Sequence, residues 1–316
     1  MKQSSKNISS ALFGLIAFII SMFFLGYYTL GDQEHYRLFY SEINNYSIAD
    51  GFIAYRNYLG ANEPVYFFIV YFLSHIFEKD VLFSIINGFF AFALAKVLLN
   101  LQIKPIILYS FLLNFYFLVL LFSAERLKVS LMFFLIAFLF KKPIYNVFFL
   151  FLSILSHLQA LILVYVQKFS QLKKEFVKFL NSGNLFKILL AICIILGFIS
   201  VIFVMRGYLQ DKLLAYSEKG GISNVIKPIV FFFFTLYYSK AKWHDIFFMF
   251  LPLILASIVV GEERIVIFCY GIFMYYALQV KRGMNFGVFI TNIYFIYKGI
   301  EFLLNIINNN NGFDGN

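Results

Sequence analysis

The chain has 316 residues, of which 62% are hydrophobic and only 13% are charged, and its mean hydropathy is +0.82. A water-soluble domain has too little interior to bury so much apolar surface, so the composition excludes a soluble protein and indicates an integral membrane protein. The net charge of +10 does not predict nucleic-acid binding, because the basic residues are distributed as the positive-inside rule of membrane proteins requires.

The first apolar run, residues 11–30, is long enough to cross a bilayer, which takes about 20 helical residues. It follows Lys2 and Lys6, and no small-residue cleavage site accompanies it. These features are typical of a retained signal anchor rather than of a cleaved signal peptide. The run therefore predicts a first membrane-spanning helix that starts on the cytoplasmic side.

Further apolar runs follow along the chain, at about 64–77, 81–100, 105–122, 127–140, 143–155, 158–167, 186–205, 228–240, 244–260, 265–280 and 286–304. If every run crossed the membrane, the basic turns at Lys96, Lys104 and Lys141-Lys142 would lie outside, which reverses the positive-inside rule. The conflict disappears if the run 64–77 stays outside as an interfacial or re-entrant helix. This run is short and starts at a proline, as such a helix would.

With 64–77 left outside, fifteen Lys and Arg residues lie in cytoplasmic segments and eleven lie outside. The sequence therefore predicts an all-α polytopic membrane protein with about 11 (10–12) transmembrane helices. We expect a single transmembrane domain over residues 1–316. The segments 31–80 and 206–227 are expected on the outer side, the first of them with interfacial helices. The Asn-rich tail, residues 305–316, is expected to be flexible.

The outer segment 31–63 contains a helical pattern. Aromatic and apolar residues follow the i, i+3, i+4, i+7 spacing of one helix face, namely Tyr36, Phe39, Tyr40 and Ile43. This spacing predicts an amphipathic helix on the outer leaflet. A second helix is expected over 50–59, and Pro64 starts the interfacial helix, because proline is common at a first helical position.

Two outer carboxylates are candidate catalytic bases. Asp32 lies in the first turn of the predicted amphipathic helix, where a carboxylate also complements the helix dipole. Glu63 immediately precedes Pro64 on the outer side of the predicted topology. Helix capping alone would explain Asp32, so both interpretations stay open.

Arg126 is the leading candidate for binding phosphate. Its guanidinium is always charged and presents a planar fork of donors that matches phosphate oxygens. The alternatives are an arginine that reaches the outer lipid headgroups or one that pairs with its neighbour Glu125. Arg264, which follows Glu263 in another predicted outer turn, is a second candidate of the same kind.

His157 lies between two short apolar runs on the predicted outer side. An imidazole in this position either donates to a diphosphate or accepts a hydroxyl proton near neutral pH. The alternative is a turn histidine whose hydrogen bonds are satisfied locally. The sequence contains no Walker loop, HExxH, CxxC or GxSxG motif, so we expect neither a cofactor nor a metal.

The order and spacing of these residues resemble the Wzy/EpsG family of bacterial polysaccharide polymerases. The resemblance covers about residues 30–280, and it is carried by Gly31-Asp32 with Tyr36 and Tyr40, Glu63-Pro64-Val65-Tyr66, Arg126, Lys141-Lys142, Ser156-His157-Leu158-Gln159-Ala160-Leu161 and Glu263-Arg264. Where the family often has small residues after the arginine, this chain has Leu127-Lys128-Val129.

The resemblance implies a GT-C-like fold in the bacterial inner membrane, with the active site on the periplasmic side. The implied activity is a glycosyltransferase that joins undecaprenyl-diphosphate-linked oligosaccharide repeats into O-antigen, capsule or exopolysaccharide. The implied partners are this lipid-linked substrate, membrane lipid and a chain-length regulator protein, without nucleic acid. Arg126, Arg264 and His157 would bind the diphosphate, and His157 is also a candidate for proton transfer. Asp32 or Glu63 would be the base, and the glycan or acceptor would contact Tyr36, Tyr40, Tyr66 and Glu263.

Two other functions fit the same sequence less well. A flippase for lipid-linked saccharide should carry polar residues through the whole membrane depth, whereas here they cluster outside. A membrane acyltransferase that modifies surface glycan should place a histidine near an aspartate within a membrane funnel. The chain has a single histidine at an outer hairpin, His157, which fits this function less well.

Overall fold

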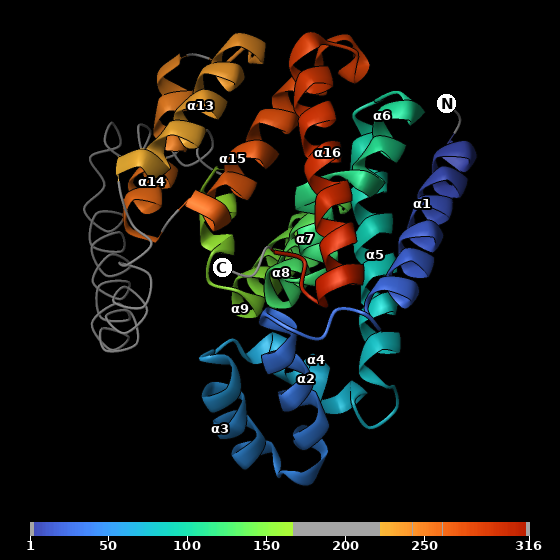
Figure 1. The fold of residues 1–316 in the computed structure, drawn as a ribbon. Helices are drawn as coiled ribbons and strands as arrows, with labels where there is room; N and C mark the ends of the chain where they lie inside the picture. The colour runs from blue at the N-terminus through green and yellow to red at the C-terminus, as the bar shows by residue number, and fades with distance from the viewer. Residues whose placement is uncertain (1–2, 167–221, 242, 261, 314–316) are drawn as a thin grey trace, which may run out of the picture. The chain divides into compact units, whose positions relative to one another are not determined.

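The computed structural model describes residues 3–166, 222–241, 243–260 and 262–313 (Figure 1). These residues form helices and connecting turns, and none of them lies in a strand. The predicted all-α class is therefore confirmed for the described residues. The chain divides into two compact units, one made of residues 1–161 with 278–316 and the other of residues 162–277.

Three helices of the first unit are long and apolar enough to cross a membrane, over Ser4–Phe24, Lys79–Asn100 and Val280–Asn309. They contain α1 (Gln3–Phe24), α5 (Lys79–Asn100) and α16 (Phe286–Asn309), the last preceded by the 3-10 helix η4 (Val280–Gly283). The 22 residues of α5 extend over about 33 Å, enough for a hydrocarbon core of about 30 Å. These lengths support a membrane protein.

A bent helix pair forms a further candidate span. It consists of α6 (Pro105–Ser110) with the 3-10 helix η2 (Phe111–Leu113), followed by α7 (Phe115–Phe122) at an angle of 56°. The break falls at Asn114, whose side-chain oxygen accepts hydrogen bonds from two backbone N–H groups in the first turn of α7. Asn114 thus caps the second helix. With this pair the described residues hold up to four spans by length and composition, so the sequence-based number of about 11 stays a prediction.

The helices α1 and α5 pack closely through two glycines. A Cβ atom added to Gly14 would lie 2.8 Å from the carbonyl oxygen of Gly88. Small residues at such a crossing let two backbones approach each other, which is a common way for helices to associate in membranes. Asn87, next to this contact, donates to the Ser21 hydroxyl and to the carbonyl oxygen of Leu121, so it joins α5 to both α1 and α7.

Three short helices follow α1 and precede α5: α2 (Asp32–Glu42), α3 (Ile48–Leu59) and α4 (Pro64–Leu73). They lie beyond the ends of α1 and α5 that are remote from the N-terminus (Figure 1). The helices expected over 31–43 and 50–59 and the helix start at Pro64 are all present. The ten residues of α4 extend over about 15 Å, half of a hydrocarbon core, which agrees with a helix that does not cross.

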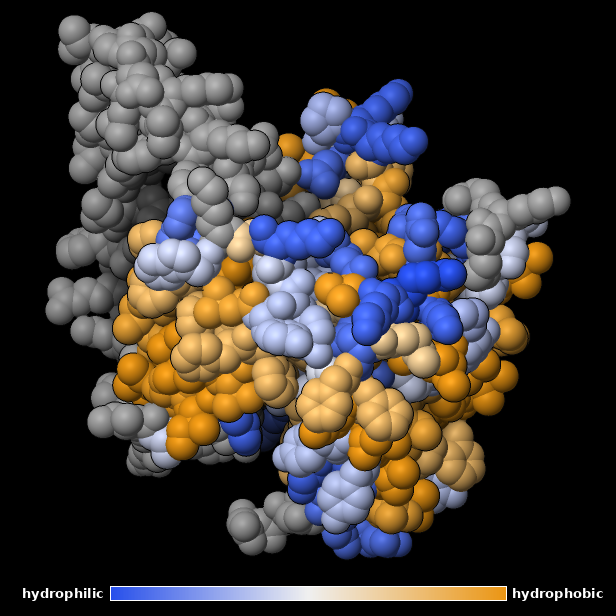
Figure 2. Space-filling model, turned by 90° about the horizontal axis from the view of Figure 1, so that it is seen from above, coloured by the Kyte–Doolittle hydropathy of each residue, from blue (hydrophilic) through white to orange (hydrophobic). Residues whose placement is uncertain are grey.

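The opposite end of the first unit is basic. Lys96, near the end of α5, donates to the side chain of Asn7 at the start of α1. The backbone N–H of Lys104 donates to the carbonyl of Arg282 (3.1 Å), and Arg282 Nε donates to the carbonyl of Gln102 (2.8 Å). Two loops far apart in the sequence therefore meet here. Viewed from above, hydrophilic residues gather between margins of hydrophobic ones (Figure 2).

The helices α8 (Glu125–Leu139) and α9 (Pro143–Ser156) pair with each other. Ser130 donates to the carbonyl of Ser153 and Ser153 donates to the carbonyl of Ser130, both at 2.8 Å. With 15 and 14 residues these helices are short for a full crossing, as the runs 127–140 and 143–155 predicted. The helix expected over 158–167 starts at Ala160 and is described up to residue 166.

The second unit contains α13 (Ile226–Tyr238), α14 (Trp243–Val260) and α15 (Glu262–Ala277), with the 3-10 helix η3 (Ile222–Val225) before them. Their apolar stretches are shorter than those of the spans above. Aromatic rings fill the space between them, and the ring centroids of Phe231 and Phe273 lie 5.7 Å apart. Most of the predicted outer segment 206–227, up to residue 221, lies outside the described residues.

The C-terminal tail differs from the sequence-based expectation of flexibility from residue 305. The helix α16 instead continues to Asn309, and the carbonyl oxygen of Asn310 accepts hydrogen bonds from the backbone N–H groups of Thr29 and Leu30. The Phe313 ring packs against Phe302, with centroids 5.4 Å apart. These contacts join the described part of the tail to the rest of the first unit.

Candidate functional site

The candidate site is centred on the Glu63 carboxylate, which contacts three side chains from three different helix ends or faces. Its Oε2 atom lies 3.1 Å from Arg126 Nη1 and 3.2 Å from the Tyr55 hydroxyl, and its Oε1 atom lies 3.0 Å from His157 Nδ1. The backbone N–H of Asn62 also donates to Oε2, at 3.0 Å. Residues 55, 63, 126 and 157 are thereby brought together from α3, α4, α8 and α9.

The local sequence explains why Glu63 lies at this position. Gly60 ends α3 in the left-handed conformation (φ 54°), which a glycine adopts at little cost. Pro64 then starts α4, and Glu63 is extended as its N-cap residue without a side-chain cap hydrogen bond. The carboxylate is therefore available to Arg126 and His157.

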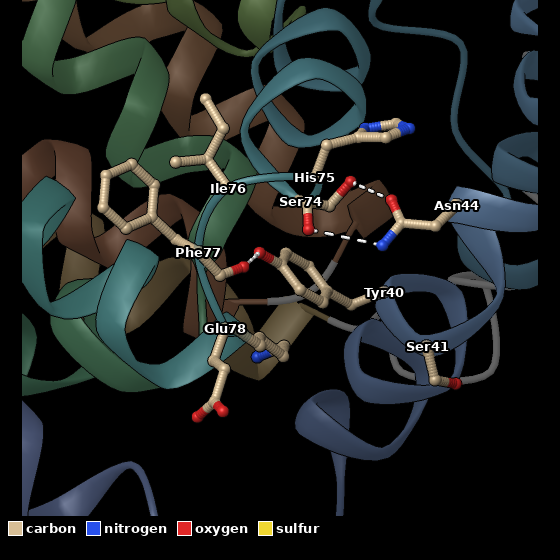
Figure 3. Close-up of a pocket in the computed structure, with 9 residues that line it drawn as sticks. Tyr40, Ser41, Asn44, Ser74, His75, Ile76, Phe77 and Glu78 are labelled. Atoms are coloured by element: carbon tan, nitrogen blue, oxygen red, sulfur yellow. Dashed lines mark hydrogen bonds between the residues drawn. The ribbon is translucent and has the colours of Figure 1, made fainter.

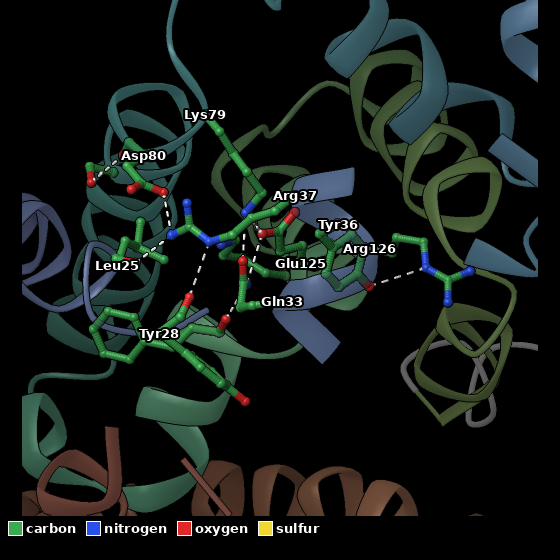
Figure 4. A network of polar contacts seen from close by, with 12 residues as sticks. Leu25, Tyr28, Gln33, Tyr36, Arg37, Lys79, Asp80, Glu125 and Arg126 are labelled. Atoms are coloured by element: carbon green, nitrogen blue, oxygen red, sulfur yellow. Dashed lines mark hydrogen bonds and ion pairs between the residues drawn. The ribbon is translucent and has the colours of Figure 1, made fainter. Parts of the chain in front are cut away.

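Arg126 lies in the first turn of α8, and its side chain contacts Glu63 and Tyr36 instead of its neighbour Glu125. Besides the Glu63 contact, Arg126 Nε donates to the Tyr36 hydroxyl at 3.4 Å (Figure 4). Consecutive helical residues point about 100° apart, so Glu125 and Arg126 face different surroundings. Arg126 pairs with Glu63, and the alternative pairing with Glu125 is not observed.

His157 is the C-cap residue of α9, where the backbone turns from helical to extended. Its Nδ1 atom faces Glu63, and its Nε2 atom lies 3.2 Å from Gln159 Oε1. If the Gln159 amide is turned by 180°, its N–H group donates to Nε2 of a neutral ring, which is the tautomer that a carboxylate at Nδ1 favours. Glu63 thus orients the imidazole through Nδ1, while Nε2 contacts Gln159.

The site is nearly closed but remains accessible. The side chains of Glu63, Arg126 and His157 are 10%, 12% and 13% exposed. Burial by itself would raise the pKa of Glu63, but the His157 hydrogen bond and the Arg126 charge lower it to about 2. Glu63 therefore stays ionised and is a weak base. Burial and the nearby Glu63 charge raise the pKa of Tyr55 well above its ordinary value, so its hydroxyl remains a donor.

A second polar cluster, which we call the buried layer, lies next to this site. It consists of Gln33, Lys79 and Glu125, which are labelled in Figure 4, together with Tyr66. Glu125 Oε1 accepts from Lys79 Nζ at 2.8 Å and from Gln33 Nε2 at 2.9 Å, and Glu125 Oε2 accepts from the Tyr66 hydroxyl at 2.7 Å. Lys79 also donates to Gln33 Oε1 at 2.5 Å. All four side chains are buried. This layer joins α2, α4, α5 and α8.

The structure brings together five of the nine residues predicted from the sequence. Glu63, Arg126, His157 and Tyr36 form the site, and Tyr66 lies in the buried layer, where its ring centroid is 6.2 Å from that of Tyr36.

Tyr40 and Asp32 lie elsewhere in the first unit, and Glu263 and Arg264 belong to the second unit. Tyr40 donates instead to the carbonyl of Phe77, at the edge of an open groove of about 440 Å³ that Asn44, Ser74 and Glu78 also line (Figure 3). Asp32 is exposed and accepts a hydrogen bond from the Ser123 hydroxyl at 3.2 Å. Glu263 and Arg264 lie in the first turn of α15 in the second unit, and their side chains lie outside the described part of the chain.

Sequence reasoning missed Tyr55, Gln33 and Lys79. Tyr55 is one of 22 tyrosines, and nothing in its local pattern distinguishes it. Lys79 had a usable signal, because a lysine that opens a membrane-spanning helix requires a counter-charge. Among the described residues, no group of three or more His, Cys, Asp and Glu is arranged to hold a metal ion. No protein-family model, no curated protein and no solved structure matches the chain.

Proposed function

We propose that this chain is a membrane glycosyltransferase that polymerises lipid-diphosphate-linked oligosaccharide repeats. The observation that supports it is the contact of one carboxylate, Glu63, with both Arg126 and His157 at an accessible position beyond the ends of the spanning helices. A fixed guanidinium suits a diphosphate, and an oriented imidazole suits a hydroxyl that must lose its proton. Polymerisation of such repeats requires both functions at one place.

The reaction needs little beyond positioning and charge. The acceptor hydroxyl oxygen forms a bond to the anomeric carbon of the donor saccharide while the bond from that carbon to the diphosphate oxygen breaks. The hydroxyl proton passes to His157, and the electron pair leaves on the diphosphate. Arg126 stabilises this developing charge, which is the role that preorganised donors fill in many enzymes.

For the proton acceptor the geometry favours His157 over the carboxylates. A carboxyl group whose pKa is about 2 takes up a proton poorly, and Glu63 is held by the Arg126 ion pair and by the hydrogen bond with His157. Asp32 is exposed, and its carboxylate accepts a hydrogen bond from Ser123 instead of from a residue of the site. We therefore assign Glu63 the role of orienting His157. Arg264 remains a proposed second ligand of the diphosphate.

The same proposal specifies the substrate, the product, a partner protein and the membrane in which the chain would lie. The substrate would be an undecaprenyl-diphosphate-linked repeat, and the product O-antigen, capsule or exopolysaccharide, with a chain-length regulator protein as a partner. The chain would cross the bacterial inner membrane about 11 times. The helices α2–α4 would then lie on the periplasmic side, opposite the basic end at Lys96, Lys104 and Arg282.

A gene-deletion strain tests the class of activity. We expect its surface polysaccharide to contain single repeats without long chains, and the chain carried on a plasmid should restore long chains. Complete loss of surface saccharide would support a flippase instead. Long chains that lack only acyl substituents would support an acyltransferase, for which a His–Glu pair would also serve.

Reconstituted protein tests the chemistry directly. Purified chain in lipid nanodiscs would receive the lipid-linked repeat extracted from the deletion strain. We expect a ladder of products and release of free lipid diphosphate in equal amounts to the linkages formed. Intact substrate together with transport across a vesicle membrane would contradict the proposal.

A further inference from the structure

Two layers of side chains come from the same three helices. The outer layer is the site itself, with Tyr36 on α2, Glu63 at the start of α4 and Arg126 on α8. The buried layer uses Gln33 on α2, Tyr66 on α4 and Glu125 on α8. In each helix, the outer residue therefore lies within one helical turn of the buried residue. The pairs, with the outer residue first, are Tyr36 and Gln33, Glu63 and Tyr66, and Arg126 and Glu125.

Lys79 is the exception, and it has no counterpart in the outer layer. It opens α5, one of the long spanning helices, and supplies the positive charge that the Glu125 carboxylate requires. The two side chains are 7% and 1% exposed, and Gln33 contacts both of them. A buried charge that loses its partner is strongly destabilising, so α8 is held in the rotation that points Glu125 toward Lys79.

This rotation also determines where Arg126 points. Arg126 follows Glu125 directly, so its side chain is directed about 100° away, toward Tyr36 and Glu63. Its own contacts would fix it only loosely, because the hydrogen bond to Tyr36 is long at 3.4 Å and Glu63 is shared with His157. The stronger restraint on the direction of Arg126 lies one residue earlier, in the buried ion pair.

We propose that Lys79 and Glu125 are positioning residues that present Arg126 to an anionic diphosphate. The ligand in this proposal rests on the proposed function, whereas the restraint on Arg126 does not. Neither residue touches the substrate. Their effect is to fix the place of the guanidinium, and small displacements of a binding group cost affinity and rate.

Binding of inorganic diphosphate tests the proposal. In the variant Lys79→Met with Glu125→Gln, both partners of the ion pair are removed together, so neither is left without the other. We expect its affinity for inorganic diphosphate to fall about tenfold. On the background Arg126→Lys the same pair of changes should add almost nothing, because the guanidinium being positioned is already absent.

The matched control is Ser130→Ala. Ser130 is fully buried in the same helix and donates to the carbonyl of Ser153 in α9, outside the buried layer. We expect this variant to keep the wild-type affinity within about threefold. An equal loss in the control, or losses that add to that of Arg126→Lys, would overturn the proposal. Tyr66→Phe, which removes one hydrogen bond from Glu125 without a charge change, gives a milder second variant with a smaller loss of the same kind.

A second measurement separates this inference from the proposed function. The melting temperatures of Arg126→Gln, Glu63→Gln and the combined variant reveal whether residues 126 and 63 are coupled. We expect non-additive shifts in the wild-type background and additive shifts once Lys79 and Glu125 are replaced. If the wild-type protein binds no diphosphate but this coupling depends on the buried pair, only the proposed function fails. Coupling that persists unchanged would reject the positioning role.

Discussion

Glu125 and Arg126 are consecutive on α8, yet each side chain binds a different partner: the Glu125 carboxylate lies 2.8 Å from Lys79 Nζ, and the Arg126 guanidinium lies 3.1 Å from the Glu63 carboxylate. The dipeptide therefore does not form its own ion pair. One residue ties α8 to the spanning helix α5, and the other projects into the accessible site.

This division has a consequence for substitutions at the two positions. A change at Glu125 disturbs a carboxylate that is 1% exposed and accepts three hydrogen bonds, so it acts on the fold and on the direction of α8. A change at Arg126 acts on a side chain that is 12% exposed, and the protein can keep its fold. The two neighbours should thus be separable by experiment.

Arg126→Lys is expected to lower polymerisation about a hundredfold while the protein still reaches the membrane in normal amounts. Lysine keeps the charge but has a single ammonium in place of the planar fork, so it cannot hold Glu63, Tyr36 and an anion at once. Product ladders from membranes of the deletion strain carrying each variant measure this effect. Arg56→Lys, an exposed arginine at the end of α3, is the control and should behave like wild type. Near-normal long chains from Arg126→Lys would reject the diphosphate-binding role.

His157→Gln is expected to bind the lipid-linked repeat with nearly the wild-type affinity and to lose at least about a hundredfold in single-turnover transfer. Glutamine retains a polar group near Glu63 but cannot take up the acceptor proton. Binding to nanodisc-embedded protein and rapid-quench transfer, measured on the same preparation, separate the two effects. His35→Gln removes an exposed histidine from α2 and serves as the control. A loss of affinity larger than the loss of turnover would assign His157 to the diphosphate instead.

Much of the fold was accessible from the sequence because apolar run length and helix periodicity are local properties. The amphipathic spacing of Tyr36, Phe39 and Tyr40 predicted α2, and Pro64 predicted the start of α4. The C-terminal tail was not accessible in this way. Its order depends on Asn310 accepting hydrogen bonds from residues 29 and 30, which are about 280 positions away in the sequence.

The sequence predicted which residues belong to the site, but not which of their side chains contact each other. Glu63, Arg126 and His157 were each conspicuous as polar residues beside apolar runs, and the structure joins them in one cluster. Asp32 was equally conspicuous but lies apart, because its place in the first turn of α2 directs it toward Ser123. Which carboxylate meets which arginine depends on helix rotation. That rotation is determined by buried contacts such as Lys79–Glu125, and the sequence pattern does not report them.

The topology makes a prediction for cysteine labelling. Asn57 and Glu78 are exposed and flank α4 on either side, so Asn57→Cys and Glu78→Cys should both react with a membrane-impermeant thiol reagent applied from the periplasmic side. Lys104→Cys, at the basic end, should react only after the membrane is permeabilised. Labelling of one flanking cysteine without the other would mean that α4 crosses the membrane.

The Arg126 ion pair and the His157 hydrogen bond of Glu63 predict a specific acid sensitivity. The pKa of Glu63 falls from an ordinary value of 4.5 to about 2 in the folded protein. Its ionised form therefore stabilises the folded state above about pH 4.5, and this contribution disappears as the pH falls toward 2, with a size on the order of 3 kcal/mol. We expect the melting temperature of the purified wild-type protein to drop between about pH 5 and pH 3 more steeply than that of Glu63→Gln, which has no proton to take up.

Glu78→Gln, which removes an exposed carboxylate from the same outer segment, should keep the wild-type slope. Equal slopes in the wild type and in Glu63→Gln would show that Glu63 is not held as an ion in the folded state, and the role of Glu63 in orienting His157 would have to be abandoned.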